Sequence, residues 1–271
     1  MRKHFNKTVV GISAPKSILA KKFIKKFRKK YNFLFYKLDI TNSRTFEKWL
    51  KLNKNINVFI NFAAITSRKD CEKFKFKAMN VNYKGVINLL KILNKNDLDN
   101  FYYFLSLSSS HVFKKSNRIL NEKSQKKPDN YYGVSKLFME RFIYKNKNNY
   151  QFKIGIARIF NYFTADTKKS FFVNDVLKKL KSKKKKITFK SVDAYRDFVN
   201  MDDLINSIDF LLKNKLVGEY NISSGRKYLL KDIIKEINIK YKKELKFIDT
   251  KEKSLFGSNL KIFKKGFKFK K

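Results

Sequence analysis

The sequence predicts an α/β protein with a doubly wound parallel sheet and a small C-terminal lobe. Over roughly the first 160 residues, short apolar segments of strand type alternate with segments whose apolar residues recur at helical spacing. Such alternation is typical of a parallel sheet covered by helices on both faces. The apolar content of 43%, with 28 Phe, supports a substantial core, and the low counts of 2 Pro and 8 Gly do not indicate disorder.

The first part of the chain contains the predicted elements of this sheet. Thr8–Ile12 is a β-branched run and Val58–Ala64 is almost wholly apolar, as a strand buried on both faces should be. The full set of expected strands is Thr8–Ile12, Phe33–Leu38, Val58–Ala64, Phe101–Ser108 and Lys153–Ile159. The expected helices are Ile18–Lys30, Ser43–Leu52, Phe76–Leu93 and Tyr131–Lys145, and the first two have apolar residues at helical spacing. We expect residues 1–160 to form one domain.

The remainder of the chain is less regular. Its expected elements are the strand Ile187–Lys190, the helix Met201–Asn214, the strand Glu219–Ile222 and the helix Leu229–Tyr241. We found no internal repeat and no clear flexible linker. We therefore expect residues 161–271 to form a small lobe interleaved with the last elements of the sheet.

The net charge of +43 invites comparison with nucleic-acid-binding proteins, and we argue against it. The excess is almost all Lys, spread along the whole chain, without the Arg and aromatic interleaving typical of specific readers. Asn, Ile, Phe and Tyr are also heavily used, as a base-composition bias would produce. We expect a solvated basic surface that attracts anionic small molecules and no specific nucleic-acid partner.

The cysteine and histidine content and the hydropathy argue against disulfide-bonded, metal-binding and membrane-spanning proteins. Cys71 is the single cysteine, so an intramolecular disulfide is excluded, and no His nearby would activate it as a nucleophile. His4 and His111 are too far apart to suggest a metal site. No apolar run approaches the roughly 18 residues that a membrane span needs, and Lys16 interrupts the only candidate for a signal sequence. We expect a cytoplasmic protein with no membrane or metal partner.

The strongest chemical signal is Tyr132-Gly133-Val134-Ser135-Lys136. Tyr132 and Lys136, four apart on a helix, share one face. A nearby ammonium favours the phenolate and lowers the pKa of a tyrosine, which can then exchange a proton with a hydroxyl or carbonyl. In a chain so rich in Tyr and Lys, an isolated pair would more often be a solvated helix face.

A second signal lies upstream, where the apolar strand Phe104–Leu107 ends in the hydroxyls Ser108-Ser109-Ser110. Hydroxyls at the carboxyl end of a parallel strand face the ligand crevice, although a serine-rich turn is the plainer alternative. We expect one of these hydroxyls to bond the same substrate oxygen as Tyr132.

Together these segments resemble the extended short-chain dehydrogenases, the NAD-dependent epimerases, dehydratases and reductases of nucleotide sugars. The resemblance rests on Ser-Ser-Ser-x-Val-Phe followed by Pro128-x-x-x-Tyr132-Gly133-x-Ser135-Lys136-x-x-x-Glu140. It implies a Rossmann-like fold, with Ser109, Tyr132 and Lys136 as catalytic residues. It also implies that Lys136 holds the nicotinamide ribose.

Further matches occur in the family's order over nearly the whole chain. By this resemblance the cofactor site comprises Gly11, Ser13, Ala14, Ser17, Asp39, Ile40, Ala63, Ala64 and Asn82 together with Tyr132 and Lys136. The substrate site comprises Ser110, His111, Asn161 and Arg196. The signature Arg196-Asp197-Phe198-Val199-Asn200-Met201-Asp202-Asp203 and the segment Tyr220–Gly225 match as well.

A narrower resemblance is to the dTDP-4-dehydrorhamnose reductases, which reduce a 4-keto sugar. It rests on Ile60–Thr66, on Asp70-Cys71-Glu72 and on the compact segment Leu38–Thr41. The Arg196–Asp203 signature is more typical of epimerases and dehydratases. Reductase is therefore the first prediction and epimerase or dehydratase the second, with a possible homodimer through a helix pair.

The phosphate-binding loop departs from the family's pattern. A Gly-x-x-Gly-x-x-Gly motif would fall on Gly11, Ala14 and Ser17, and only the first of these is glycine. Ala14 and Ser17 are the smallest substitutes, and Ser17 can donate to a phosphate at a helix N-terminus. The departure leaves a non-catalytic, nucleotide-binding relative as an alternative. The choice between NAD and NADP stays open, because Lys37 is as well explained as a surface lysine.

Overall fold

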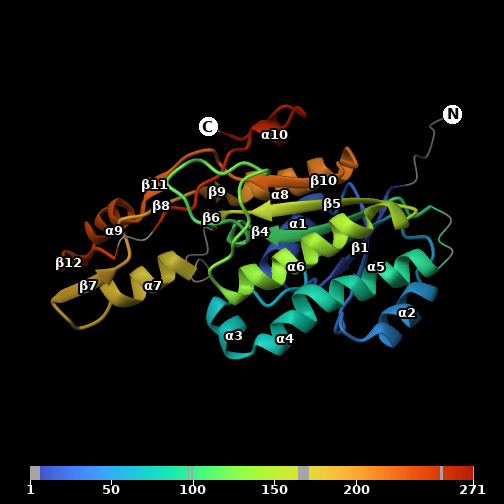
Figure 1. The fold of residues 1–271 in the computed structure, drawn as a ribbon, viewed down its shortest axis with the longest axis horizontal. Helices are drawn as coiled ribbons and strands as arrows, with labels where there is room; N and C mark the ends of the chain where they lie inside the picture. Colours follow the sequence, from blue (N-terminus) through green and yellow to red (C-terminus); the bar gives the residue numbers. More distant parts are fainter. Residues whose placement is uncertain (1–6, 97, 99, 164–170, 251–252, 271) are drawn as a thin grey trace. The chain divides into compact units, whose positions relative to one another are not determined.

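The computed structural model describes residues 7–96, 98, 100–163, 171–250 and 253–270 (Figure 1). The chain divides into two compact units. Unit 1 contains Met1–Val112, Lys126–Arg158 and Ile205–Tyr220, and unit 2 contains Phe113–Gln125, Ile159–Leu204 and Asn221–Lys271. The predicted boundary at residue 160 and the substrate-binding role of the second segment stay predictions.

The main sheet has six strands in the order β10-β5-β4-β3-β1-β2, and the pairs β1–β2, β1–β3 and β3–β4 are parallel. Its strands are β1 (Val9–Ser13), β2 (Asn32–Tyr36), β3 (Val58–Asn61), β4 (Tyr103–Ser109), β5 (Lys153–Ile159) and β10 (Gly218–Ile222). The accompanying helices are α1 (Ile18–Phe27), α2 (Ser43–Lys51), α3 (Arg68–Lys73), α4 (Lys75–Met79), α5 (Gly85–Lys95), α6 (Tyr131–Asn146) and α8 (Met201–Lys213). The predicted α/β architecture is confirmed.

Helices cover both faces of this sheet. Figure 1 shows α2, α5 and α6 side by side along one face, where they enclose the larger apolar core. That core contains Phe46, Phe59, Leu90, Phe104 and Met139, all nearly inaccessible to solvent. Near the end of α1, Tyr31 donates a hydrogen bond to Asp209 of α8 at 2.6 Å. The amphipathic patterns of the sequence therefore mark the faces that pack on the sheet.

Two predicted elements differ from the observed ones for a shared reason. The strand predicted to reach Ala64 ends at Asn61, and the helix predicted from Phe76 is interrupted by a π-helical turn at Asn80–Lys84. Asn82, in that turn, binds the backbone N–H and carbonyl of Ile65. The chain after β3 thus bonds to a side chain instead of a neighbouring strand.

Unit 2 has its own smaller core. Its strands pair as β6 with β9, β7 with β12 and β8 with β11. They are β6 (Asn161–Phe163), β7 (Lys186–Lys190), β8 (Tyr195–Arg196), β9 (Phe198–Asn200), β11 (Tyr228–Leu229) and β12 (Glu244–Ile248). Its helices are α7 (Phe171–Leu180), α9 (Leu230–Asn238) and α10 (Leu260–Phe263). The core packs Leu180 and Phe189 against Phe198 and Ile234.

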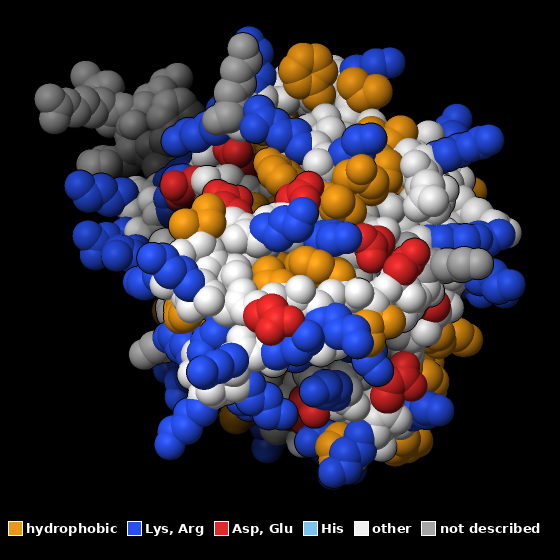
Figure 2. Space-filling view, turned by 90° about the vertical axis from the view of Figure 1, so that its left-hand side faces the viewer, with side chains coloured by type: hydrophobic (Ala, Val, Ile, Leu, Met, Phe, Trp, Pro, Cys, Tyr) orange, Lys and Arg blue, Asp and Glu red, His pale blue; other side chains and the backbone are white. Residues whose placement is uncertain are grey.

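The positive charge is dispersed over the face of the molecule that Figure 2 shows. Figure 2 shows Lys and Arg side chains spread over one face among acidic and apolar ones, with no single basic stripe. Within the described residues, no helix combines the length and apolar character needed to cross a bilayer.

Candidate active site

The first part of the site is the turn that follows β4. Ser109 ends the strand, and Ser110–Val112 form a single 3-10 turn directly after it. The Ser109 hydroxyl oxygen accepts a hydrogen bond from the His111 N–H at 3.2 Å, which leaves its own hydrogen free to rotate. Ser109 and Ser110 are buried, whereas His111 is partly exposed. The predicted hydroxyl cluster therefore lies at the carboxyl end of a central strand.

The second part is the first turn of α6, which contacts that turn directly. A Cβ atom on Gly133 would lie 2.1 Å from the carbonyl oxygen of His111, so only glycine permits this approach. Asn130 caps the helix by accepting from the Gly133 N–H at 2.9 Å, and its amide nitrogen lies 3.1 Å from Nδ1 of His111. The rings of His111 and Tyr132 meet edge to face with centroids 5.9 Å apart. The fold thus places Tyr132 beside the segment that begins at Ser109.

Lys136 is buried one turn further along α6. Its Nζ donates to the carbonyl oxygen of Leu107 at 2.8 Å, two residues before Ser109. Burial lowers the pKa of Lys136 to about 8, against the opposing effects of Cys71 and Glu140. Burial also raises the pKa of the Cys71 thiol to about 11, which keeps it protonated at neutral pH.

Asn82 joins the site from the π-helical turn. Its side chain accepts from the Ile65 N–H at 2.8 Å and donates to the Ile65 carbonyl at 3.0 Å. It also contacts the hydroxyl of Ser135 in α6 at 3.0 Å. Asn82 is fully buried, so these bonds connect the segment after β3 to the helix that carries Tyr132 and Lys136.

The carboxyl ends of β1 and β3 are joined by a small polar cluster. The Ser13 hydroxyl donates to Oδ1 of Asn61 at 2.6 Å, and the Ala63 N–H contacts both groups. Ala63 and Ala64 are partly exposed and have no bulk beyond Cβ. At the carboxyl ends of β1 and β3 the partly exposed side chains Ala63 and Ala64 are therefore small.

The loop between β1 and α1 keeps the geometry of a glycine-containing loop. Ala14 has a φ of 46°, in the left-handed region that favours glycine. The Ser17 N–H closes the turn onto the Ala14 carbonyl at 2.9 Å, and Ser17 is the N-cap of α1. No acidic residue lies in the first turn of α1. A helix N-terminus of this kind binds phosphate, so the loop fits the pyrophosphate of a dinucleotide.

The remaining predicted cofactor residues lie in unit 1 as well. Gly11 is in the middle of β1, where an added Cβ would collide with the side chains of Ile56 and Phe59, so it is needed for core packing. Asp39 is exposed and accepts from the Thr41 N–H at 2.8 Å, and Ile40 is buried. The Asp39 carboxylate is thus exposed to solvent, and its contact with the adenosine stays a prediction.

Asn161 and Arg196, predicted to bind substrate, lie in unit 2. Asn161 donates to the Asp197 carbonyl at 3.2 Å, and Arg196 donates to the Tyr195 carbonyl at 2.9 Å. Burial raises the pKa of the Asp197 carboxyl to about 6, although the Ser224 and Gly225 N–H groups oppose this. Asp197, between β8 and β9, therefore bonds the start of the Arg196–Asp203 signature to the backbone of Ser224 and Gly225 inside unit 2.

The sequence analysis assigned no role to Glu140, although this residue ends the motif that contains Tyr132 and Lys136. Its carboxylate pairs at 2.8 Å with Arg158, whose side chain is only 2% exposed. Spacing was the available signal, because Glu140 follows Lys136 by one helical turn. Among the residues that the structure describes, no group of three or more His, Cys, Asp or Glu side chains could hold a metal ion.

Comparisons with known proteins identify the family and the fold of this chain. A sequence profile of the "NAD dependent epimerase/dehydratase family" matches residues 7–223. The dTDP-D-glucose 4,6-dehydratase of Dictyostelium discoideum is 25% identical over 222 residues, which cover 77% of this chain and 50% of that protein. The GDP-6-deoxy-D-mannose reductase of Pseudomonas aeruginosa is 25% identical over 167 residues, covering 58% of this chain and 54% of the relative. This chain thus spans about half the length of these curated relatives.

Solved structures share the fold over more of the chain. RMD from Pseudomonas aeruginosa, complexed with NADPH, superposes with a TM-score of 0.83 at 18% identity, over 97% of this chain and 94% of the other. A dTDP-4-dehydrorhamnose reductase from Bacillus anthracis, in complex with NADP, gives a TM-score of 0.81 at 21% identity over 97% and 94%. At these identities the likeness establishes the fold.

Proposed function

The chain belongs to the NAD dependent epimerase/dehydratase family, and from this premise we propose that it is an NAD(P)-dependent oxidoreductase of a nucleotide-linked sugar. One observation carries the proposal. The turn after Ser109 packs directly on the first turn of α6 at Gly133, and Lys136 of α6 bonds to Leu107 of the same strand. A strand-end hydroxyl, a tyrosine and a lysine therefore occupy one region of unit 1.

In this proposal Tyr132 is the acid or base. It gives a proton to the sugar oxygen during reduction and takes it back during oxidation. Lys136 favours the Tyr132 phenolate through its positive charge, and Ser109 donates to the same sugar oxygen and orients it. When bound, NAD(P) would supply the hydride for reduction or accept it in oxidation.

The cofactor would lie along the carboxyl edge of the sheet. The loop between β1 and α1, which contains Ala14 and Ser17, would hold its pyrophosphate together with the N-terminus of α1, and Asp39 with Ile40 would meet the adenosine. Ala63, Ala64 and Asn82 would line its path, and Lys136 would hold the nicotinamide ribose. The glycine-like φ of Ala14 supports this assignment despite the missing glycines.

Reduction of a 4-keto sugar is the reaction we favour. Two similar proteins are named as reductases, one for GDP-6-deoxy-D-mannose and one for dTDP-4-dehydrorhamnose. We assign Ser110, His111, Asn161 and Arg196 to the substrate. Epimerase or dehydratase activity is the second candidate, because the Arg196–Asp203 signature and the Dictyostelium relative favour it. The substitutions at Ala14 and Ser17 motivate a non-catalytic, nucleotide-binding relative as the third.

The proposal also includes a homodimer and a cytoplasmic location. On α6, Phe138 is 44% exposed and Tyr144 is 70% exposed, and Tyr83 contacts Phe138 edge to face. An exposed aromatic face of this kind is typical of a surface that packs against another protein. The use of a single cysteine supports a reducing compartment.

The first test is a titration of the purified protein with NADH and with NADPH, followed by nicotinamide fluorescence. We expect saturable binding of at least one of them. The bound complex is then mixed with 4-keto nucleotide sugars, and loss of the reduced cofactor is followed by absorbance. A folded protein that binds neither cofactor would contradict the enzyme proposal and favour the non-catalytic relative.

A further inference from the structure

Glu140 continues the series of functional positions on α6. Tyr132, Lys136 and Glu140 follow one another at intervals of four residues, so they share one face of the helix. Lys136 and Glu140 are 2% and 4% exposed. The Glu140 carboxylate accepts a hydrogen bond from the Ser108 hydroxyl at 2.5 Å, while Lys136 bonds to Leu107. Leu107 and Ser108, adjacent residues of β4, are therefore both hydrogen-bonded to α6, and they directly precede Ser109.

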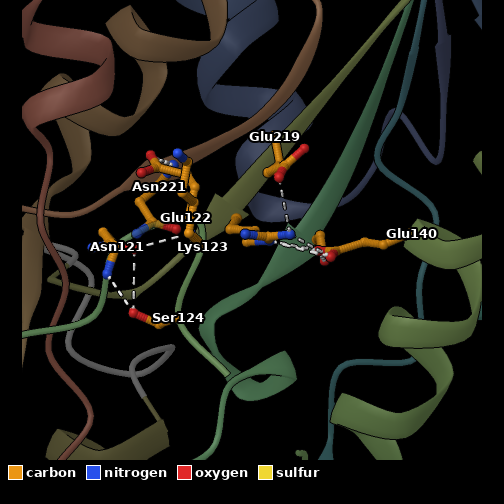
Figure 3. Close-up of polar contacts among 9 residues, drawn as sticks. Asn121, Glu122, Lys123, Ser124, Glu140, Glu219 and Asn221 are labelled. Carbon is orange, nitrogen blue, oxygen red and sulfur yellow. Dashed lines mark hydrogen bonds and ion pairs between the residues drawn. The ribbon is translucent and has the colours of Figure 1, made fainter. Parts of the chain in front are cut away.

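A buried arginine completes this attachment. Nε of Arg158 lies 3.0 Å from Oε1 of Glu140, and a terminal nitrogen lies 2.8 Å from Oε2. Figure 3 shows the carboxylates of Glu140 and Glu219 both directed at this guanidinium, although Glu219 is 3.9 Å away and 30% exposed. The side chain of Glu140 thus links α6 to β4 and β5 at once, which Glu219 does not do.

The charges around Lys136 give Glu140 a second effect. Cys71 of α3 and Glu140 of α6 are the titratable groups that act on the Lys136 ammonium group. The Leu107 carbonyl of β4 accepts the hydrogen bond of this ammonium group. Cys71 is protonated at neutral pH, because burial raises its pKa. Lys126 and Arg158 also lie near the Glu140 carboxylate. Glu140 is therefore the anion that opposes the loss of the Lys136 proton.

We propose that Glu140 is a positioning residue for Tyr132 and Lys136, which sets the register of α6 against β4 through Ser108 and Arg158 and keeps the Lys136 ammonium charged. This role rests on the proposed function, because it matters only if Tyr132 and Lys136 act on a substrate. A buried ion pair with a purely structural role is the alternative, and it predicts a change of stability without a change in the chemistry.

The test compares Glu140→Gln with the matched control Glu219→Gln. Both remove one carboxylate from Arg158, but only the first removes the contact with Ser108 and the charge beside Lys136. For Glu140→Gln we expect kcat to fall at least tenfold with KM within about threefold, and the alkaline limb of the pH profile to move down by about one pH unit. For Glu219→Gln we expect kcat, KM and the profile to stay within twofold of the wild type.

A second readout needs neither cofactor nor substrate. The free energy of unfolding in urea is measured against pH for the wild type, Glu140→Gln, Lys136→Met and the double variant. Because the pKa of Lys136 is lowered to about 8 in the folded protein, the free energy of unfolding should rise as the pH increases above 8. Loss of the Glu140 charge should make this rise begin at a lower pH. The difference should vanish in the Lys136→Met background. The same displacement with and without Lys136 would overturn the electrostatic part of the proposal.

Two further results separate the remaining possibilities. If Glu140→Gln does not fold, Ser108→Ala replaces it, since it removes one bond and keeps the ion pair. We then expect kcat to fall several-fold with an unmoved pH profile, and wild-type kcat would overturn the positioning role. If Tyr132→Phe keeps full turnover, the proposed function fails, whereas the urea measurements still report whether Glu140 acts on Lys136.

Discussion

The ammonium group of Lys136 is buried and donates a hydrogen bond to the backbone carbonyl of Leu107 at 2.8 Å. Because Leu107 lies two residues before Ser109, this contact joins the helix that carries Tyr132 to the strand that ends in the candidate hydroxyl. It also places a cation out of solvent, where its charged form is unfavourable. The contact thus has consequences for both activity and stability.

Replacement of Lys136 by Met should abolish turnover and stabilise the folded protein at pH 7. The pKa of Lys136 is lowered from 10.5 to about 8, so its charged form costs up to about 3 kcal/mol in the folded state. Below pH 8 both states are protonated and the cost is present in full; it is relieved as the pH rises from 8 to 10.5. Urea denaturation of Lys136→Met should lack this alkaline rise, and an unchanged rise would contradict the assignment.

Removal of the Tyr132 hydroxyl should separate catalysis from binding. We expect Tyr132→Phe to lower kcat by about 10²- to 10⁴-fold, the usual contribution of a positioned acid or base. The affinity for NADH or NADPH should stay within about threefold, because the ring and its contact with His111 remain. Tyr144→Phe, which changes an exposed tyrosine of the same helix, is the control and should leave kcat unaltered.

Substitution of Asn82 should loosen the segment after β3. Asn82→Ala removes the side-chain partners of Ile65 and Ser135 in the interior, and we expect a loss of about 2 to 4 kcal/mol in the free energy of unfolding. Amide hydrogen exchange at residues 63–65 should rise with it. Asn88→Ala, which loses one bond of 3.2 Å to Thr41, should cost less than about 1.5 kcal/mol. Equal losses would show that the three-bond network has no special weight.

The left-handed turn at Ala14 gives a prediction about the degraded loop. A residue other than glycine in the left-handed conformation destabilises the folded state by about 1 kcal/mol. Glycine would remove this strain, but it would also give the unfolded chain more conformational freedom, which lowers stability by a similar amount. We therefore expect Ala14→Gly to change stability by less than about 1 kcal/mol and to bind NADH at least as tightly. Ala14→Val should weaken binding and lower stability by more than 1 kcal/mol, because β-branched residues are outliers at positive φ. Tighter binding by the valine variant would contradict the loop assignment.

Local pattern was sufficient for the regular elements of the main sheet. The strand Lys153–Ile159 has the predicted bounds, and the predicted helix from Tyr131 extends one residue further, to Asn146. The strand is marked by its β-branched residues and the helix by its N-cap, since the Asn130 side chain accepts from the Gly133 N–H. The helices α3 and α7 and the strand β12 were missed. α3 and β12 are only six and five residues long, whereas α7 has a clear apolar face that the sequence analysis overlooked.

The alternation of strand-like and helix-like segments was enough to predict the α/β architecture, because these periodicities are local properties of the chain. Ser109, Tyr132 and Lys136 were named through the order of family motifs, and their catalytic roles stay predictions. Only the tertiary structure decided that Gly133 must be glycine, that Asn82 binds Ile65 and that Glu140 pairs with Arg158. These relationships join residues that are 17 to 22 positions apart, and no local preference specifies them. They arise because buried polar groups must find partners and because close packing leaves no room for an added Cβ, and both conditions exist only once the strands and helices have come together.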